Sequence, residues 1–272
     1  MSKYIRNKKT DGLNKKVSKR IIIENHITHL TRVGSTMDYA WNLFEQGKVE
    51  NGLVILADHQ TSGRGRTGNK WFSNKGEDIL CSVLLKLKVS VIPEILMAAA
   101  LSVVYTIRPY VDDAKITIKW PNDIQIDGNK ISGVIAESRF QQSDSLCSVV
   151  VGIGLNINLD PNGHDFLPYR TTSMKTLLKR DVDRLSILNL LLNHFDILLQ
   201  RLSKGESIVN EWKSYLNCVG EEITYSYVGT GKSSKHLKAL VENVDSYGRL
   251  LLIDKSGYRY CVSAGDIRIM ID

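Results

Sequence analysis

The chain has 272 residues, 43% of them hydrophobic, so it is long enough to bury the core of one large domain or of a medium domain with a small one. Its formal net charge of +7 belongs to the first 20 residues, which hold eight basic side chains and one acid. The whole chain has 36 basic and 29 acidic residues, so the remaining 252 residues hold 28 of each sign. Because this part of the chain has no net charge, a broad cationic surface for nucleic acid is disfavoured.

Cysteine and histidine usage predicts neither disulfides nor a metal site. The cysteines lie far apart without a C-x-x-C pair, which favours a reducing compartment; they are Cys81, Cys147, Cys218 and Cys261. His26 and His29 have helical spacing, but no Glu lies between them and no third ligand is evident. No apolar run of about 18 residues and no secretory signal is present. We expect a cytoplasmic protein, with organelle targeting by the basic N-terminal arm as the less favoured alternative.

The first predicted elements surround a glycine-rich loop. Ser35 and Thr36 precede a segment with helical apolar spacing that ends at Gly47, so a helix is predicted with one of the two residues as its cap. Residues 53–57 and 79–85 are apolar runs typical of strands. The loop between these strands therefore joins two neighbours in a sheet.

That loop, residues 60–71, contains the run Gly-Arg-Gly-Arg-Thr-Gly at 63–68. Glycines allow a close backbone approach to a ligand, and Arg64 and Arg66 offer planar forks of donors to phosphate or carboxylate oxygens. The pattern indicates an anion-binding loop. Two alternatives stay open: a flexible Arg-Gly segment that binds nucleic acid, and a plain surface loop.

The middle of the chain predicts a buried helix and a hairpin. Residues 94–107 are nearly apolar all round, which is typical of a buried helix. Residues 116–120 alternate as a strand, and turns at 121–123 and 127–129 lead to a strand at 130–137. This geometry brings Asp123 and Lys130 into one cavity or leaves them as an exposed ion pair worth little.

A further strand is predicted at 148–158, with Gly152 and Gly154 inside it. The third glycine of a dinucleotide-binding fingerprint is missing, so that function is rejected. Glycines inside a strand indicate a bulge or a close backbone approach to a ligand. Asn156 either presents its amide to a base edge or, like Asn158, satisfies local backbone groups.

The C-terminal part changes character. Residues 185–202 and 208–216 are predicted helices. Five short strands follow, a pattern typical of a small β-barrel; they are residues 223–228, 237–244, 249–253, 258–262 and 267–271.

Four motifs, in this order, resemble those of the biotin protein ligases, also called biotin–[acetyl-CoA-carboxylase] ligases: Ser35-Thr36, the loop 60–71, Lys119-Trp120-Pro121-Asn122-Asp123 with Lys130-Ile131-Ser132-Gly133, and Gly152-x-Gly154-x-Asn156-x-Asn158. The resemblance implies an α+β fold, with the central mixed sheet and flanking helices of the class II synthetase-like biotin/lipoate ligases and a small C-terminal SH3-like β-barrel. It implies a basic arm at residues 1–28, a catalytic domain at 29–216 and the barrel at 217–272.

The resemblance implies a reaction in two steps. The carboxylate of biotin attacks the α-phosphate of ATP, giving biotinyl-5′-adenylate and pyrophosphate, and the adenylate then acylates a lysine of a biotin carboxyl carrier domain. Biotin and ATP are thus substrates, Mg²⁺ is the expected cofactor, and the carrier belongs to a biotin-dependent carboxylase such as acetyl-CoA carboxylase. Neither specific DNA binding nor a membrane is expected, and the family includes monomers and homodimers. Because both substrates are anions, their approach requires cationic groups in a desolvated site.

By family position, the catalytic residues are Lys130, Arg66, Arg64 and Asp123. Lys130 would bridge the carboxylate and the α-phosphate, while the loop would close as a lid that is mobile without ligand. Asp123 would bind Mg²⁺, orient Lys130 or accept the proton of the incoming lysine, and these three roles stay open. The biotin contacts are assigned to Ser35, Thr36, Met37, Gln60, Gly63, Arg64, Gly65, Arg66, Lys130 and Gly133. The ATP or adenylate contacts are assigned to Arg64, Arg66, Trp71, Lys119 and Asn156.

Two departures from the family pattern bear on function. Met37 stands where the family's Ser-Thr-Asn run has its amide, so a polar side-chain contact to biotin is expected to be missing. About 30 residues precede the catalytic region, fewer than a winged-helix DNA-binding domain needs, so a ligase without repressor function is expected.

Alternative functions are a lipoate or octanoate ligase of the same fold and a nucleic-acid-binding protein that uses the basic arm. The C-terminal barrel holds none of the four motifs, so its expected task is to seat the carrier or steady the active site.

Overall fold

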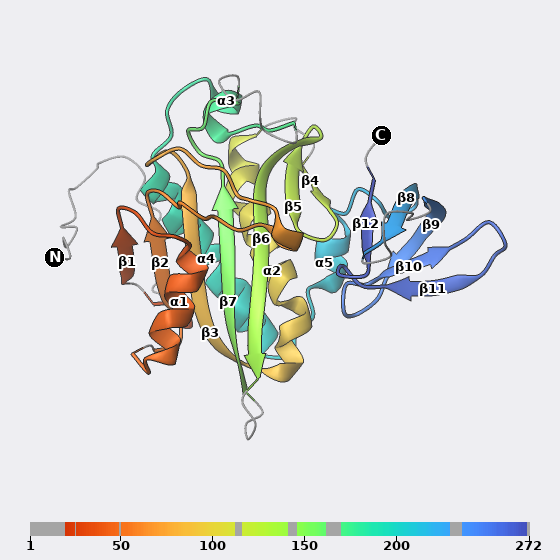
Figure 1. Ribbon diagram of the computed structural model, residues 1–272, viewed down its shortest axis with the longest axis horizontal. Helices are drawn as coiled ribbons and strands as arrows, with labels where there is room; N and C mark the ends of the chain where they lie inside the picture. Colours follow the sequence, from red (N-terminus) through yellow and green to blue (C-terminus); the bar gives the residue numbers. More distant parts are fainter. Residues whose placement is uncertain are drawn as a thin grey trace.

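Two β-sheets organise the chain, as the computed structural model shows (Figure 1). It describes residues 20–270 except 25, 49, 112–115, 141–145, 162–169 and 229–235. Residues 1–19 of the basic N-terminal arm lie outside the described residues, so the predictions about this arm stay predictions.

The larger sheet has seven strands in the order β1-β2-β3-β7-β6-β5-β4. They are β1 (Ile27–Leu30), β2 (Leu53–Ala57), β3 (Ile79–Lys88), β4 (Ile116–Lys119), β5 (Asp123–Ile126), β6 (Asn129–Phe140) and β7 (Leu146–Leu155). β1 pairs with β2 in parallel and the other neighbours are antiparallel, so the predicted mixed sheet is confirmed. β7 is the central strand, between β3 and β6, and its almost wholly apolar sequence is buried there.

Helices cover the two faces of this sheet unequally. They are α1 (Thr36–Glu45), α2 (Ile92–Ile107), α3 (Met174–Leu178), α4 (Arg184–Ser203) and α5 (Val209–Lys213). α2 packs against β5, β6, β7 and α4, whereas α1 packs against β2, β3 and β7. On β3, Val83 joins the α2–α4 core and its neighbour Leu84 joins the α1 core, because successive strand side chains point to opposite faces. α1 therefore lies on the face opposite α2, and the rest of that face is available for a pocket.

The segment 89–110 is long and apolar enough to span a membrane by composition alone, but α2 carries most of it into the protein core. The prediction of a buried helix there is confirmed, with its first turn beginning at Ile92 and Pro93. The predicted helix at 208–216 is shorter than expected, since only 209–213 are helical.

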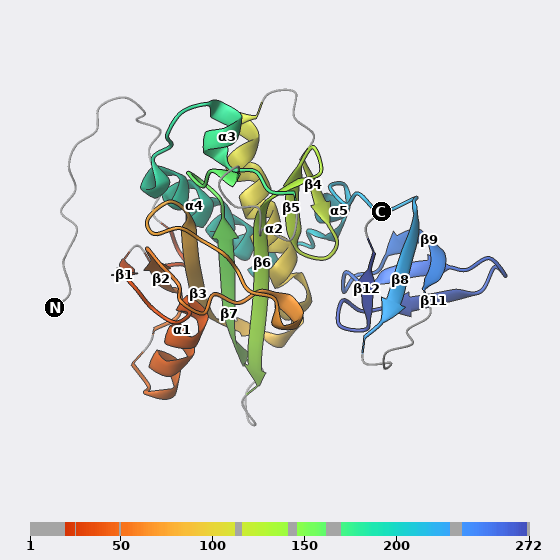
Figure 2. The same ribbon diagram turned by 45° about the horizontal axis from the view of Figure 1, so that its top comes forward.

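The C-terminal strands form a five-stranded antiparallel sheet in the order β11-β10-β9-β8-β12. They are β8 (Glu222–Tyr227), β9 (Leu237–Val244), β10 (Leu250–Ile253), β11 (Arg259–Val262) and β12 (Ile267–Ile269), which confirms the five predicted strands. Figure 2 shows this unit beside α5 and the β4 edge of the large sheet. Gly248 marks the contact: its carbonyl accepts a 2.9 Å hydrogen bond from Trp120 Nε1, and a Cβ there would lie 2.6 Å from Met97 Cε.

Candidate functional site

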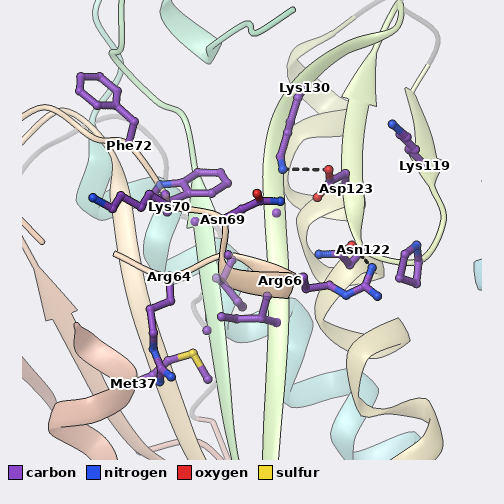
Figure 3. Close-up of a pocket in the computed structure, with 18 of the residues that line it drawn as sticks. Met37, Arg64, Arg66, Asn69, Lys70, Phe72, Lys119, Asn122, Asp123 and Lys130 are labelled. Atoms are coloured by element: carbon purple, nitrogen blue, oxygen red, sulfur yellow. Dashed lines mark hydrogen bonds and ion pairs between the residues drawn. The ribbon is translucent and has the colours of Figure 1, made fainter. Parts of the chain in front are cut away.

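A cavity of about 620 Å³ lies on the α1 face of the large sheet, under the loop 60–71 (Figure 3). Its volume is in the range of small-molecule sites. Of the predicted site residues, all but Gly63 line it: Ser35, Thr36, Met37, Gln60, Arg64, Gly65, Arg66, Trp71, Lys119, Asp123, Lys130, Gly133 and Asn156. Residues spread over more than a hundred positions of sequence therefore meet in one pocket.

The α1 end of the pocket is a buried network of short polar side chains. Thr36 donates to Gln60 Oε1 from its backbone N, at 2.8 Å, and from Oγ1, at 3.0 Å. Thr36 Oγ1 also lies 2.7 Å from Ser82 Oγ. Ser35 stands at the N-cap position, but its side chain makes no capping hydrogen bond. The predicted start of the helix at Ser35 or Thr36 is confirmed, but the expected side-chain cap is absent at Ser35, and this buried side chain lines the pocket.

The glycines of β6 and β7 allow side chains to lie directly on the sheet backbone. A Cβ on Gly154 would lie 2.5 Å from the Trp71 ring, and one on Gly152 would lie 2.8 Å from Met37 Sδ. The pairing of β7 with β3 runs through both positions without a shift, so the alternative of a bulge is excluded. The close approach is made by the protein's own Trp71 and Met37, which form part of the pocket lining.

The two arginines of the loop point to different ends of the pocket. Arg66 Nη1 donates to Asn122 Oδ1 at 3.2 Å, and its Nη2 donates to the carbonyl of Ala264. Arg64 instead pairs with Asp38 and Glu137, near Met37 (Figure 3). The loop itself is closed by backbone hydrogen bonds between Gly65 and Asn69 and between Trp71 and Gly63.

Lys130 and Asp123 form an ion pair inside the pocket rather than on the surface. Lys130 Nζ lies 2.8 Å from Asp123 Oδ2, with the two side chains 18% and 23% exposed. The ammonium also lies 5.4 Å from the centre of the Trp71 ring. The backbone of Lys130 donates to Arg170 O and accepts from Thr172 N, so the residue is held on both sides of its Cα. The pair with Lys130 is the contact that the orienting role of Asp123 requires, and the other two roles stay open.

Positive charge dominates the lining. Among the described lining residues, six are basic and one is acidic: Arg64, Arg66, Lys70, Lys119, Lys130 and Arg268 face Asp123. Burial lowers the pKa of the Lys119 ammonium and of the Arg66 guanidinium, while the charge of Asp123 acts in the opposite direction. Partly desolvated cations that outnumber the acids of the described lining favour an anionic ligand.

Asn156 satisfies a local backbone group, one of the two roles that the sequence left open, and its contact with a base edge stays a prediction. Its Nδ2 donates a 3.0 Å hydrogen bond to the Thr172 carbonyl, and the residue also lines the pocket. Behind it, the buried carboxylate of Asp78 accepts a 2.8 Å hydrogen bond from Ile157 N. Burial raises the pKa of Asp78 to about 6.

Within the described residues, no group of three or more His, Cys, Asp or Glu side chains is arranged to hold a metal ion. His29 Nε2 lies 2.7 Å from Asp58 Oδ1, and the same carboxylate pairs with Arg184. The four cysteines are unpaired thiols, which confirms the prediction that they form no disulfides.

Some residues of the site were missed by the sequence analysis. Ser82 does not line the cavity but contacts the lining residue Thr36, and a serine in an apolar strand is a weak signal that could have been followed. The C-terminal unit supplies part of one wall, with no motif to predict it: Val228, Ala264, Ile267, Arg268 and Ile269. The unit borders the pocket directly, and the two tasks expected of it, seating the carrier and steadying the active site, stay predictions.

Comparison with known proteins gives matches along most of the chain. The model of the biotin/lipoate A/B protein ligase family matches residues 30–156. The bifunctional ligase/repressor BirA of Bacillus subtilis is 30% identical over 248 residues, covering 89% of this chain and 74% of that protein. A biotin–[acetyl-CoA-carboxylase] ligase of Mycobacterium tuberculosis is 29% identical over 223 residues, covering 80% of this chain and 79% of that protein. The solved biotin protein ligase from Aquifex aeolicus, in complex with biotin and ATP, has the same fold, with a TM-score of 0.72, 23% identity, and coverage of 92% of this chain and 100% of that one.

Proposed function

The chain belongs to the biotin protein ligase family, and we propose that its pocket carries out both half-reactions of such a ligase. It activates biotin as biotinyl-5′-AMP and transfers the biotinyl group to a carrier protein. The observation that carries the proposal is the lining of six basic residues and one acid around the Lys130–Asp123 pair. Two anions can meet there only if cations offset their mutual repulsion.

In the first step, a carboxylate oxygen of biotin attacks the α-phosphorus of ATP and the bond to pyrophosphate breaks. Lys130 is oriented by Asp123 to contact the carboxylate and the α-phosphate together, and Arg66 lies at the same end of the pocket. Charge on the phosphoryl oxygens is therefore met by donors already in position.

In the second step, the amine of the carrier lysine attacks the acyl carbon of the adenylate and AMP leaves. The attacking amine must be neutral and must lose a proton as the amide forms. Asp123 is the acid of the described lining and is the group that would accept this proton. We propose a biotin carboxyl carrier domain of a carboxylase as the acceptor.

Mg²⁺ fits this pocket as a companion of ATP and not as a resident ion. The described residues hold no cluster of three metal-binding side chains, and Asp123 is already paired with Lys130. Mg²⁺ retains several waters and takes one or two carboxylates together with substrate phosphates. Asp123 is thus the residue that would contact it, and Mg²⁺ would supply charge neutralisation on the triphosphate.

The experiment that tests this function offers biotin, lipoate and octanoate separately, with ATP, and measures pyrophosphate release. We expect release with biotin. Release with lipoate or octanoate and none with biotin would identify a lipoate-type ligase instead. Mass spectrometry of a purified carrier domain incubated with the enzyme, biotin and ATP tests transfer, and an unmodified carrier would refute the second step.

A further inference from the structure

Arg64 forms ion pairs with two carboxylates. Its Nη2 lies 2.7 Å from Asp38 Oδ1 and its Nη1 lies 3.1 Å from Glu137 Oε1. Arg66 donates instead to the neutral oxygens of Asn122 and Ala264. The charge of Arg64 is thus offset by two acids, which would also repel a phosphate that approached it.

Both acids come from regular elements that do not belong to the loop. Asp38 is in the first turn of α1, and Glu137 is on β6. Glu137 is itself held in place, because its Oε2 accepts a 3.0 Å hydrogen bond from Nε1 of the buried Trp41. Arg64 therefore ties the loop to two parts of the rigid scaffold at once.

The tie lies at the α1 end of the pocket. Thr36, two residues before Asp38, holds Gln60, the first residue of the loop. Backbone bonds from Thr61 to Val33 and from Ser62 to Gly34 secure only the start of the loop. Beyond these, Arg64 is the loop side chain that connects its glycine-rich part to α1 and β6.

We propose that Asp38 and Glu137 are positioning residues that hold the loop closed over the biotin end of the pocket by clamping Arg64. The proposal rests on the proposed function, since it takes biotin to be the ligand beneath this part of the loop. Arg64 then serves closure, and charge stabilisation at the phosphate is left to Lys130 and Arg66. A loosened clamp should speed the escape of biotin more than it slows adenylate formation.

The test compares Asp38→Asn, Glu137→Gln and Arg64→Gln with the unaltered enzyme. We expect faster biotin dissociation in stopped-flow competition, by about threefold for each acid and about tenfold for Arg64→Gln, since partly exposed ion pairs are individually weak. The KM for biotin should rise in parallel, and kcat for pyrophosphate release should fall by less than about threefold. A kcat loss of about 100-fold with an unchanged KM would overturn the proposal, because Arg64 would then act in the transition state.

A double-mutant cycle shows whether the acids act through Arg64. If they do, Glu137→Gln in the Arg64→Gln background should change biotin dissociation little, whereas additive effects would overturn the proposal. Glu45→Gln is the matched control, because it breaks the exposed Arg139–Glu45 ion pair between the same helix and strand. It should leave biotin dissociation unchanged, and an effect equal to that of Glu137→Gln would attribute the result to general loosening of α1.

Salt provides a second measurement. Raising NaCl from about 0.05 M to 0.5 M should accelerate biotin dissociation from the unaltered enzyme, and the acceleration should be smaller in Arg64→Gln. An equal acceleration in both would overturn the clamp. If the unaltered enzyme bound no biotin at all, the proposed function would fail, a result distinct from any outcome for the clamp.

Discussion

The pocket has two walls. The large sheet and the loop form one wall, which presents charged and polar side chains. The C-terminal unit forms the other, where the backbone carbonyl of Ala264 accepts a hydrogen bond from Arg66. The first wall carries all four sequence motifs. The second carries none, although five of its residues line the pocket. A backbone acceptor can come from any residue, so a motif search identifies one wall and overlooks the other.

The largest expected effect tests the side-chain wall. Lys130→Ala should reduce biotin-dependent pyrophosphate release by about 100-fold or more, because the charge at the carboxylate–phosphate junction is lost. Pre-steady-state release measures this. Lys238→Ala is the control, since Lys238 forms an exposed pair with Glu222 on the C-terminal sheet. If Lys130→Ala released pyrophosphate at the rate of the unaltered enzyme, Lys130 would have no role in adenylate formation.

The second prediction concerns the contact between Trp71 and the sheet. Gly154→Ala should lower biotin affinity about tenfold, because the new Cβ forces the Trp71 ring off the strand and overpacking typically costs about 1–3 kcal/mol. Isothermal titration with biotin measures this. Gly34→Ala, where a Cβ meets no atom within 4 Å, is the control. Equal affinities for the two variants would show that the Trp71 position is unimportant for binding.

The third prediction tests the backbone wall. Gly248→Ala places a Cβ 2.6 Å from Met97 Cε, which must move, and this repacking beside the Trp120 hydrogen bond should weaken the Ala264 contact of Arg66 and raise the KM for ATP by about threefold. Gly257→Ala is a matched control, since Gly257 also has a positive φ, +85° against +74°, but lies in open space. If both variants have the same KM, backbone strain and not the wall explains the result.

The smallest effect concerns the support behind Asn156. The folded-state pKa of Asp78, about 6, lies above the unfolded value of about 3.9, so the folded protein keeps the proton longer and this residue's contribution to stability is lost as pH rises from about 4 to 6. Asp78→Asn, which retains an acceptor for Ile157 N, should therefore gain stability relative to the unaltered protein across this window. Urea unfolding from pH 4 to 7 measures the difference. A constant difference would show that Asp78 does not titrate in this window.

Asp58 gives the opposite sign for comparison. Burial alone would raise its pKa, but hydrogen bonds from Arg184 and His29 and their charges lower it. Asp58→Asn should therefore lose most stability at neutral pH and less as pH falls through the folded pKa of Asp58. The stability differences between each variant and the unaltered protein should therefore change in opposite directions as pH falls.

Sequence patterns predicted elements well where a local period decides the structure. The apolar run at 53–57 and the alternating strands of the C-terminal sheet form as expected, because burial of one or both faces follows directly from residue order. The glycine-rich loop was also located, although its two arginines were treated as a pair. Their separate surroundings depend on Glu137 and Ala264, which are distant in sequence and leave no local signal.

The three glycines beneath the loop form a notch in the side-chain layer of the large sheet. Gly133 and Gly154 are cross-strand partners on β6 and β7, and Gly152 lies two residues further along the same face. Trp71 and Met37 already fill this notch, so the missing methyl groups set how deeply these two side chains sit on the sheet. A larger residue at Gly152 or Gly154 would lift Met37 or Trp71 into the cavity, so this notch is where a ligase of this fold would adjust the space left above the two side chains.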